Sequence, residues 1–315
     1  MDHFVKIINQ VLPIIFLIAL GYWIRRKQYL KAATINELRK IVVNLALPAV
    51  LFISFLNVEF KSSYFAFFAL TIALCVMLFL LGRWIKQLFH IEHNYFPYLM
   101  TGFEYGMLGI SLFGAAYGIE NISYIAVVDL GHEIFIWFIF LPLLLVQRDG
   151  SQKPKEIVQT FLTAPVAIAI LAGIFFNFIG VRDLIYGLPV TGALMSTFNF
   201  LSNITVPLIL IIVGYGIKIN RNMLGAPLAV TLIRLIILIP LALVLNRYLV
   251  HDILQLDRMF EIALFTLLIL PPPFIIPLYT SPKLSADENE YINNTLTIHT
   301  IVSVLVFSIF FILSS

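Results

Sequence analysis

An asparagine followed four residues later by a proline occurs twice in this chain, each time inside a long apolar segment. The first copy runs from Asn44 to Pro48 and the second from Asn203 to Pro207. Proline removes a backbone donor and an amide side chain needs hydrogen-bond partners, so both residues are costly inside hydrocarbon. They persist there only where packing or function compensates for the cost.

Two further features recur with this motif. Gly21 follows Pro13 by eight residues, and Gly173 follows Pro165 by the same distance. Downstream, a glycine-rich stretch near Gly109 and the prolines at 271–273 lie at nearly equal distances after the two asparagine motifs. The repetition predicts two homologous halves, residues 1–150 and 151–315. Duplicated broken helices in a membrane protein are typical of secondary transporters.

Composition excludes an ordinary soluble domain, because 61% of the residues are hydrophobic, 12% are charged and the mean hydropathy is +0.98. A helix that crosses the hydrocarbon core needs roughly 20 residues. The sequence therefore predicts an all-α membrane protein with about ten spanning segments, near residues 5–24, 36–56, 64–82, 95–117, 122–146, 157–179, 190–217, 224–246, 260–279 and 291–313. Five segments per half is an odd number, so the second half is inverted relative to the first.

The distribution of lysine and arginine predicts the orientation in the membrane. If the segments alternate, most basic residues fall on one side, including those at 25–40, 83–86, 148–155 and 218–221. By the positive-inside rule that side is cytoplasmic. We therefore expect a multi-pass plasma-membrane protein with both termini outside and the loop from Arg148 to Glu156 inside. The basic residues lie in short loops at helix ends, which gives no support for nucleic-acid binding.

The paired asparagines are the first candidates for solute contact. Each lies one turn before a proline that frees backbone groups, and an amide can both donate and accept hydrogen bonds. The alternative is that they only join helices, at about 0.6 to 2 kcal/mol per hydrogen bond. We expect Gly106 and Gly109 to open the fourth segment, because glycine frees the backbone, and the prolines at 271–273 to break the ninth. A site where both motifs meet these two breaks predicts the following substrate-binding residues: Asn44, Pro48, Gly106, Gly109, Ser111, Asn203, Pro207, Pro271, Pro272 and Pro273.

Four ionisable residues inside apolar segments are candidates for ion coupling, since intramembrane charges are usually functional. Glu104 lies at the glycine-rich stretch, where it either carries a proton or pairs with Arg234 as a structural cation. Asp129, His132 and Glu133 share one helix face, so they form either a relay or a polar seam with Arg234. Three ligands on one face do not predict a dedicated metal site.

No enzyme motif occurs in a context that supports catalysis, and no nucleotide-binding loop is present in the sequence. Transport driven by an ion gradient, with H⁺ or Na⁺ as coupling ion and no cofactor, is the function that this pattern favours. A non-transporting membrane sensor is the alternative from another class. The expected partners are a small-molecule solute and membrane lipids, with a homodimer as one possible assembly.

The order and spacing of several motifs resemble the auxin efflux carriers and their bacterial relatives along nearly the whole chain. These motifs are Leu12-Pro13 to Gly21-Tyr22, Asn44 to Pro48, Ala164-Pro165 to Gly173, Leu188-Pro189, Arg234 to Pro240 and His299 to Ser303. The resemblance implies an inverted-repeat fold similar to that of sodium/proton antiporters and bile-acid transporters, with segments 4 and 9 broken and crossing near the midplane. It also implies an elevator-type carrier, with a scaffold near 5–56 and 157–217 and a transport domain near 64–146 and 224–313.

The same resemblance implies a small organic anion as solute, such as a mono- or dicarboxylate. The chain departs from the family pattern in the fourth segment, where Glu104 stands in place of a usual asparagine and Ser111 in place of a usual proline. A carboxylate at the crossover repels an anion unless it is protonated or paired. A cationic, zwitterionic or apolar solute is therefore the alternative.

Overall fold

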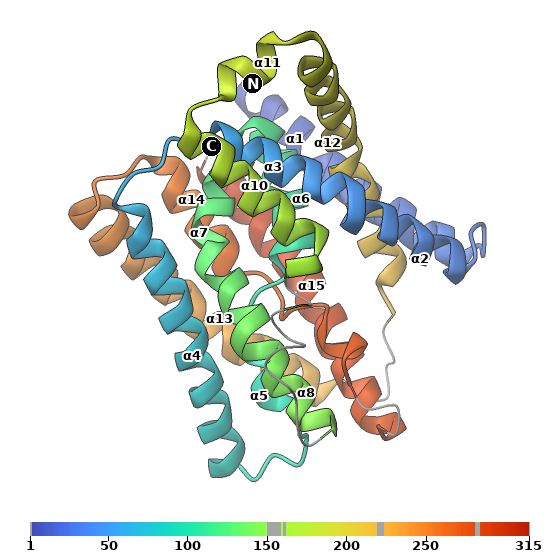
Figure 1. Ribbon diagram of the computed structural model, residues 1–315. Helices are drawn as coiled ribbons and strands as arrows, with labels where there is room; N and C mark the ends of the chain where they lie inside the picture. The colour runs from blue at the N-terminus through green and yellow to red at the C-terminus, as the bar shows by residue number, and fades with distance from the viewer. Residues whose placement is uncertain (1, 150–158, 160–161, 219–223, 281–283, 315) are drawn as a thin grey trace.

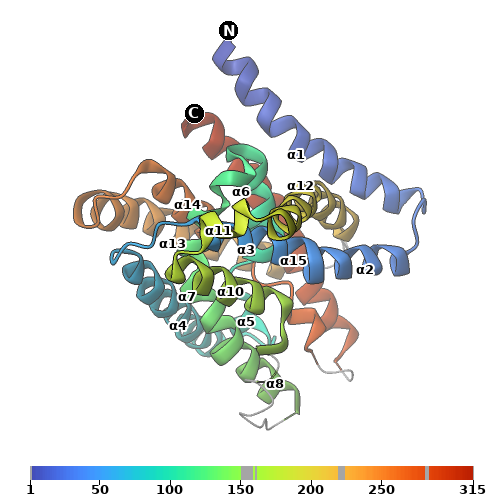
Figure 2. The same cartoon turned by 45° about the horizontal axis from the view of Figure 1, so that its top comes forward.

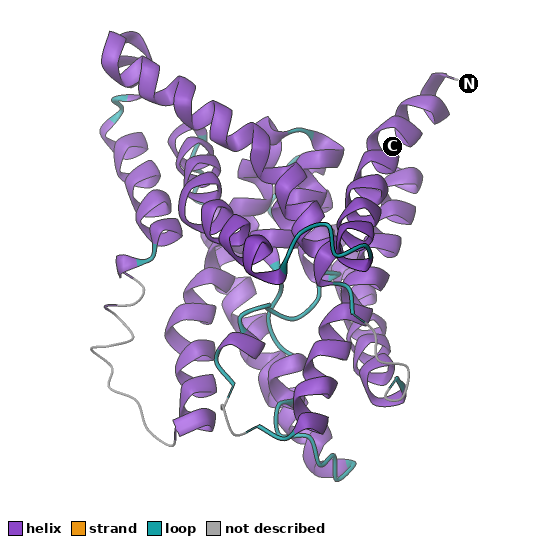
Figure 3. Cartoon of the chain, turned by 90° about the vertical axis from the view of Figure 1, so that its right-hand side faces the viewer, coloured by secondary structure: helices purple, strands orange, loops and turns teal. Residues whose placement is uncertain are grey.

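The computed structural model describes residues 2–149, 159, 162–218, 224–280 and 284–314. Within these ranges the chain is built from helices and loops and contains no strand (Figure 3). The predicted boundary between the halves at 150/151, and most of the predicted cytoplasmic loop from Arg148 to Glu156, lie outside the described residues.

The first half contains five helical stretches, of which the fourth is interrupted. They are α1 (Asp2–Arg26); α2 (Ala32–Ile41) continuing through the π-helical turn η1 (Val42–Ala46) into α3 (Leu47–Asn57); α4 (Tyr64–Leu88); the short α5 (Phe96–Leu99) followed by η2 (Tyr105–Gly109) and α6 (Ile110–Tyr117); and η3 (Ile119–Asn121), α7 (Ile122–Phe135), η4 (Ile136–Phe140) and α8 (Leu141–Asp149). The π-helical turn η1 comes directly before α3, whose second residue is Pro48. Proline cannot donate to the preceding turn, which accounts for the irregular hydrogen bonding there.

Among its described residues the second half also shows five helical stretches, and the fourth is again interrupted. Its elements are α10 (Pro165–Ile179), α11 (Arg182–Gly187), α12 (Pro189–Gly216), α13 (Gly225–Leu245) with η5 (Asn246–Ile253), α14 (Arg258–Leu268) with η6 (Ile276–Leu278), and α15 (Ala286–Ser314). Pro165 and Pro189 are the first residues of their helices, where a missing N–H costs nothing. The short helix α11 was not predicted.

Each of the ten predicted segments overlaps one or more helical elements among the described residues. Six helical stretches are long and apolar enough to cross a membrane, namely Ala32–Asn57, Tyr64–Leu88, Ile119–Arg148, Pro189–Gly216, Gly225–Ile253 and Ala286–Leu313. Shorter apolar helices cover Tyr105–Tyr117 and Pro165–Ile179. Both ends of the chain lie toward the same end of the molecule, and the end of α8 lies toward the opposite one (Figures 1 and 3).

The helices pack most closely where glycines let two backbones meet. A Cβ on Gly21 of α1 would overlap the carbonyl oxygen of Ile211 in α12, and a Cβ on Gly214 of α12 would overlap that of Ile18 in α1. Small residues permit such close approach between helices in lipid. Figure 2 shows α1 lying along α12.

The other recurring glycine of the sequence, Gly173 of α10, has equivalent surroundings. A Cβ there would lie 2.8 Å from the carbonyl oxygen of Phe52 in α3. The recurring glycines therefore each hold a helix of one half against a helix of the other, α1 against α12 and α10 against α3. In the remaining helices, Gly131 of α7 meets the backbone of Phe68 in α4 in the same way.

Candidate functional site

The two interrupted stretches touch each other at their breaks, residues 100–104 and 269–275. The backbone N–H of Glu104 donates to the carbonyl oxygen of Pro271 at 2.8 Å. Gly102 has a φ of +71°, and a Cβ there would lie 2.8 Å from the Pro273 ring. Glycine is therefore needed at 102 both for its left-handed backbone and for the close approach of the second break.

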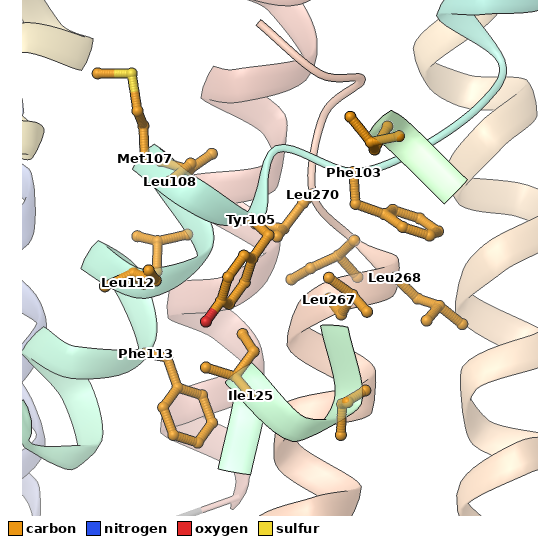
Figure 4. Close-up of a cluster of buried hydrophobic side chains, with 14 of the residues drawn as sticks. Phe103, Tyr105, Met107, Leu108, Leu112, Phe113, Ile125, Leu267, Leu268 and Leu270 are labelled. Atoms are coloured by element: carbon orange, nitrogen blue, oxygen red, sulfur yellow. The ribbon is translucent and has the colours of Figure 1, made fainter. Parts of the chain in front are cut away.

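The break in the fourth segment comes earlier than predicted. We expected Gly106 and Gly109 to open the helix, but both lie in the helical turn η2, and Ser111 lies in α6. Gly109 instead gives room to the other break, because a Cβ there would lie 2.8 Å from the Leu270 side chain. Figure 4 shows the apolar contacts around the breaks, with the Tyr105 ring turned toward Ile125 of α7.

The Glu104 side chain caps the helical turns that follow both breaks. Its Oε1 atom accepts a hydrogen bond from the N–H of Met107 at 3.1 Å, and its Oε2 atom accepts one from the N–H of Phe274. The first bond satisfies an N–H of the first turn after the break in its own segment, and the second an N–H just before η6. A carboxylate suits these positions, because free N–H groups and the helix dipole both favour negative charge.

Arg234 of α13 holds the opposite ends of the breaks. Its guanidinium donates to the carbonyl oxygens of Leu99 at 3.3 Å, Gly102 at 2.8 Å and Leu270 at 3.2 Å. It is fully buried and lies 5.5 Å from the centre of the Phe103 ring. A cation is favoured there because the carbonyls that end a helix have no intrahelical partners and carry partial negative charge.

The predicted pairing of Arg234 with a carboxylate is therefore corrected. Within the described residues its hydrogen bonds go to backbone carbonyls, and no ion pair joins it to Glu104, Asp129 or Glu133. Arg234 balances the partial negative charge of backbone carbonyl groups at the breaks instead of the charge of a side chain.

The cluster on α7 divides into two separate arrangements. Nδ1 of His132 lies 2.8 Å from Oδ1 of Asp129, and Nε2 of His132 accepts the N–H of Phe103 at 2.9 Å. Since Nε2 accepts, the proton must be on Nδ1 and is donated to Asp129, which makes the imidazole neutral in this arrangement. Glu133 points elsewhere, and its Oε2 accepts from Nε1 of Trp137 at 3.0 Å.

A cavity of about 400 Å³ lies beside the crossing of the breaks. Glu104, Gly106, His132, Glu133 and Pro273 are the predicted site residues that line it. Its other polar side chains are Arg39, Tyr105, Trp137, Asn293, Thr297 and Thr300, and most of the remaining wall is aliphatic. Such a volume with an apolar wall and a few polar groups is typical of small-molecule sites.

The two asparagine motifs do not line this cavity, contrary to our prediction. Asn44 and Asn203 are both exposed on the surface. Along the continuous stretch of α2, η1 and α3, the lining residues Arg39, Val43 and Leu47 recur every four positions. Asn44 points about 100° away from the mean direction of these three residues. Asn203 precedes Ile212, the first lining residue of α12, by nine residues or about 13 Å along the helix.

The other predicted residues also do not line the cavity. These are Pro48, Gly109, Ser111, Pro207, Pro271, Pro272, Asp129 and Arg234. Conversely, sequence reasoning used Arg39 only for orientation and assigned no role to Trp137 or Asn293. The four-residue spacing from Arg39 to the apolar residues Val43 and Leu47 is the signal that could have identified the first of these.

The cavity reaches toward one end of the helices. Its lining includes Arg39 in α2, Val166 at the start of α10, Gly216 at the end of α12 and Asn293 in α15. Here α2, α10 and α15 begin and α12 ends. In the sequence the starts of α2 and α10 and the end of α12 adjoin the loops that are rich in lysine and arginine, whereas the loop before α15 contains only Lys283.

The long apolar helices and the two broken segments that cross beside a cavity define a multi-pass helical membrane protein with the architecture of a carrier. The sequence profile of the family described as "Membrane transport protein" matches residues 6–311. The chain therefore belongs to this family, that of the auxin efflux carriers, whose members are transporters. A comparison with curated proteins found no match for the chain.

Proposed function

We propose that this membrane transport protein is an alternating-access secondary carrier whose solute occupies the cavity beside the crossing of the two breaks. The observation that carries the proposal is the composition of the wall. One side comes from the uninterrupted helices, with Val43, Leu47 and Val213, and the other from the breaks and α7, with Glu104 and Glu133. A solute bound there touches both sets of helices, so their relative movement can expose it to either side.

The movement we propose is of the elevator type. The closest backbone contacts, at Gly21, Gly173 and Gly131, lie within each proposed unit: α1 against α12, α3 against α10, and α4 against α7. Where the units face each other, a Cβ on Gly114 of α6 would lie 3.1 Å from the Val206 side chain of α12, not from its backbone. Contacts between side chains support sliding better than interlocked backbones do, because side chains can change rotamer without moving the helix.

The described state is, in this proposal, open toward the cytoplasm. The cavity reaches the helix ends that adjoin the basic loops, which the positive-inside rule places inside. Both termini then face outward from the plasma membrane. We propose H⁺ as the coupling ion, with Na⁺ as the alternative, because two carboxyl groups line the cavity.

Counterflow in proteoliposomes tests the carrier proposal. Vesicles loaded with one unlabelled solute from a panel of carboxylates and amines are given the same labelled solute outside. An alternating-access carrier accumulates label transiently without an imposed ion gradient, because the unlabelled solute inside exchanges for it, whereas a sensor does not. Gly106→Trp fills the cavity, since nothing lies within 4 Å of a Cβ at Gly106, and should abolish counterflow.

The matched control is Gly187→Trp, which places the same side chain at an exposed glycine with open space outside the cavity. It should keep the parent's counterflow. Counterflow that survives Gly106→Trp would place the solute elsewhere, and its absence for the whole panel would contradict the carrier function.

A further inference from the structure

The N–H groups that an anionic solute would use at the crossing are already occupied. In broken-helix carriers the start of a half-helix favours negative charge, because its N–H groups are free and its dipole is positive. Here the carboxyl group of Glu104 accepts from Met107 in one segment and from Phe274 in the other. Glu104 thus holds the place of a bound carboxylate, and a second carboxylate would meet it at close range.

The charges that face the cavity sum to a negative value. Among the described lining residues Glu104 and Glu133 each contribute −1 and Arg39 contributes +1, so the formal sum is −1. His132 is neutral because its Nε2 accepts the N–H of Phe103. The Tyr105 phenol is uncharged at neutral pH.

Other charged groups near the site have their own partners. Asp129 lies behind His132 and bonds to it, and Arg234 bonds to three carbonyls of the breaks. The lining from α3, α10, α12 and α15 carries no charge among the described residues. Neither Asp129 nor Arg234 therefore cancels the negative charge of Glu104 and Glu133 at the cavity wall.

Glu133 and Trp137 supply suitable contacts for an organic cation. One oxygen of Glu133 accepts from the Trp137 indole, and the side chain is only partly buried at the cavity wall. An ammonium group beside this pair would meet both a carboxylate and an aromatic ring, and both attract it. The aliphatic wall, with Leu47, Leu51 and Ile136, suits an apolar body.

We propose that the solute is a compact apolar cation, exchanged for protons at Glu104 and Glu133. This rests on the proposed carrier function. Carboxylates facing a membrane-embedded cavity need a compensating positive charge, and either a proton or the solute supplies it. Because the two compete for the same oxygens, binding of one releases the other, which gives proton–cation antiport. No covalent step is involved.

A pair of probes that share a phenylethyl body and carry opposite charges tests the substrate class. Phenylethyltrimethylammonium carries a permanent positive charge, so it cannot cross the bilayer as a neutral base, and 3-phenylpropionate is its anionic counterpart. Proteoliposomes with an acidic lumen should take up the cation, and uptake should collapse when the pH gradient is removed. Uptake of 3-phenylpropionate instead would overturn the inference and leave the carrier function standing.

Binding is measured separately by the shift in melting temperature that each probe causes in purified protein. The parent should be stabilised by the cation alone. A protein that neither binds nor transports the cation overturns the inference even if counterflow of another solute succeeds. A protein that binds the cation without moving it would refute the proton exchange of the cation, and the carrier function would still stand if counterflow of another solute succeeds.

Two variants identify the groups responsible. Glu133→Gln keeps an acceptor for Trp137 and removes the charge, so the affinity for the cation should fall by about tenfold or more. The control is Glu37→Gln, at an exposed carboxyl on α2 that pairs with Lys40, and it should bind as the parent does. Equal affinity in Glu133→Gln and the parent would overturn the role of Glu133.

Glu104→Ala vacates the N–H groups of Met107 and Phe274. Formate should then stabilise the variant in proportion to its concentration and leave the parent unaffected, because it restores the missing carboxylate. If Glu104→Ala does not fold without formate, recovery of folded protein in formate gives the same result. No response to formate would show that Glu104 does not act as a built-in anion.

Discussion

Nε2 of His132 accepts the N–H of Phe103 at 2.9 Å, which ties the tautomer of a buried histidine to the backbone of the first break. The Nδ1 proton is then committed to Asp129. A second proton on His132 would sit on Nε2, where its N–H would face the N–H of Phe103. Two donors cannot bond to each other, so protonation of this ring requires the break to move. His132 can therefore change charge only together with the crossing.

The Asp129 acceptor is the first point at which this arrangement can be tested. Asp129→Leu leaves the Nδ1 proton of a buried ring without a partner and should lower stability by about 1 to 3 kcal/mol. Asp129→Asn still offers an oxygen to Nδ1 and should lower stability less. Thermal unfolding in detergent compares the two, and equal losses would show that the His132 hydrogen bond contributes nothing.

Arg234 provides a second test, because its role differs from the predicted ion pair. Arg234→Met should destabilise the protein by about 3 to 5 kcal/mol, since buried carbonyls in both breaks lose their charged donor. Arg247→Met removes an exposed arginine whose nearest acid, Asp252, is 3.7 Å away, and should cost less than about 1 kcal/mol.

An ion-pair role for Arg234 would give a different result in a double variant. If Arg234 balanced Glu104, adding Glu104→Gln to Arg234→Met would restore stability, because it would remove the uncompensated charge. We expect the double variant to be less stable than either single one. Recovery on thermal unfolding would contradict the carbonyl-binding role.

The glycine contacts between helices give a third prediction. Gly21→Ala and Gly214→Ala each force a methyl group into a facing backbone and should cost about 1 to 3 kcal/mol. Gly187→Ala is the control, since its Cβ would meet nothing within 4 Å. If all three variants have the same melting temperature as the parent, α1 and α12 do not approach as closely as described.

Much of the fold follows from the sequence because its apolar segments are long and well separated. Pro165 and Pro189 mark helix starts, and the prolines at 271–273 mark a break, since a residue without an N–H cannot lie in a helix interior without loss. The first break was predicted too late in the chain, at Gly106 and Gly109, because glycine permits a helix to unwind but does not force it to. The position is set by Gly102 and by capping from Glu104, which are tertiary effects.

The site was predicted in part. Glu104 was predicted as a site residue and does line the cavity, but its bond to Phe274 joins residues 170 positions apart and follows from no local pattern. The asparagine motifs were expected to line the cavity and do not, because repetition does not tell which face of a helix meets the cavity. The four-residue spacing of Arg39, Val43 and Leu47 does. The ion-coupling roles of Glu104, Asp129, His132 and Glu133 stay predictions.

The orientation of the chain is a fourth prediction, based on the distribution of lysine and arginine. A reporter active only in the cytoplasm should work when inserted between Arg148 and Glu156 and should fail when fused to either terminus. Activity at one terminus alone would mean an odd number of spans. It would also contradict two inverted halves.

Alternating access of the cavity is the central claim, and cysteine labelling measures it directly. Cys75, the only native cysteine, is buried, so Cys75→Ala gives a background without thiols. In that background Gly106→Cys places one thiol at the cavity wall, where a Cβ has free space. A membrane-impermeant maleimide should label it from the cytoplasmic side in resting vesicles and from the outer side after an imposed pH gradient, with bound phenylethyltrimethylammonium slowing both reactions. Labelling from one side only, under every gradient and unaffected by a transported solute, would contradict the account.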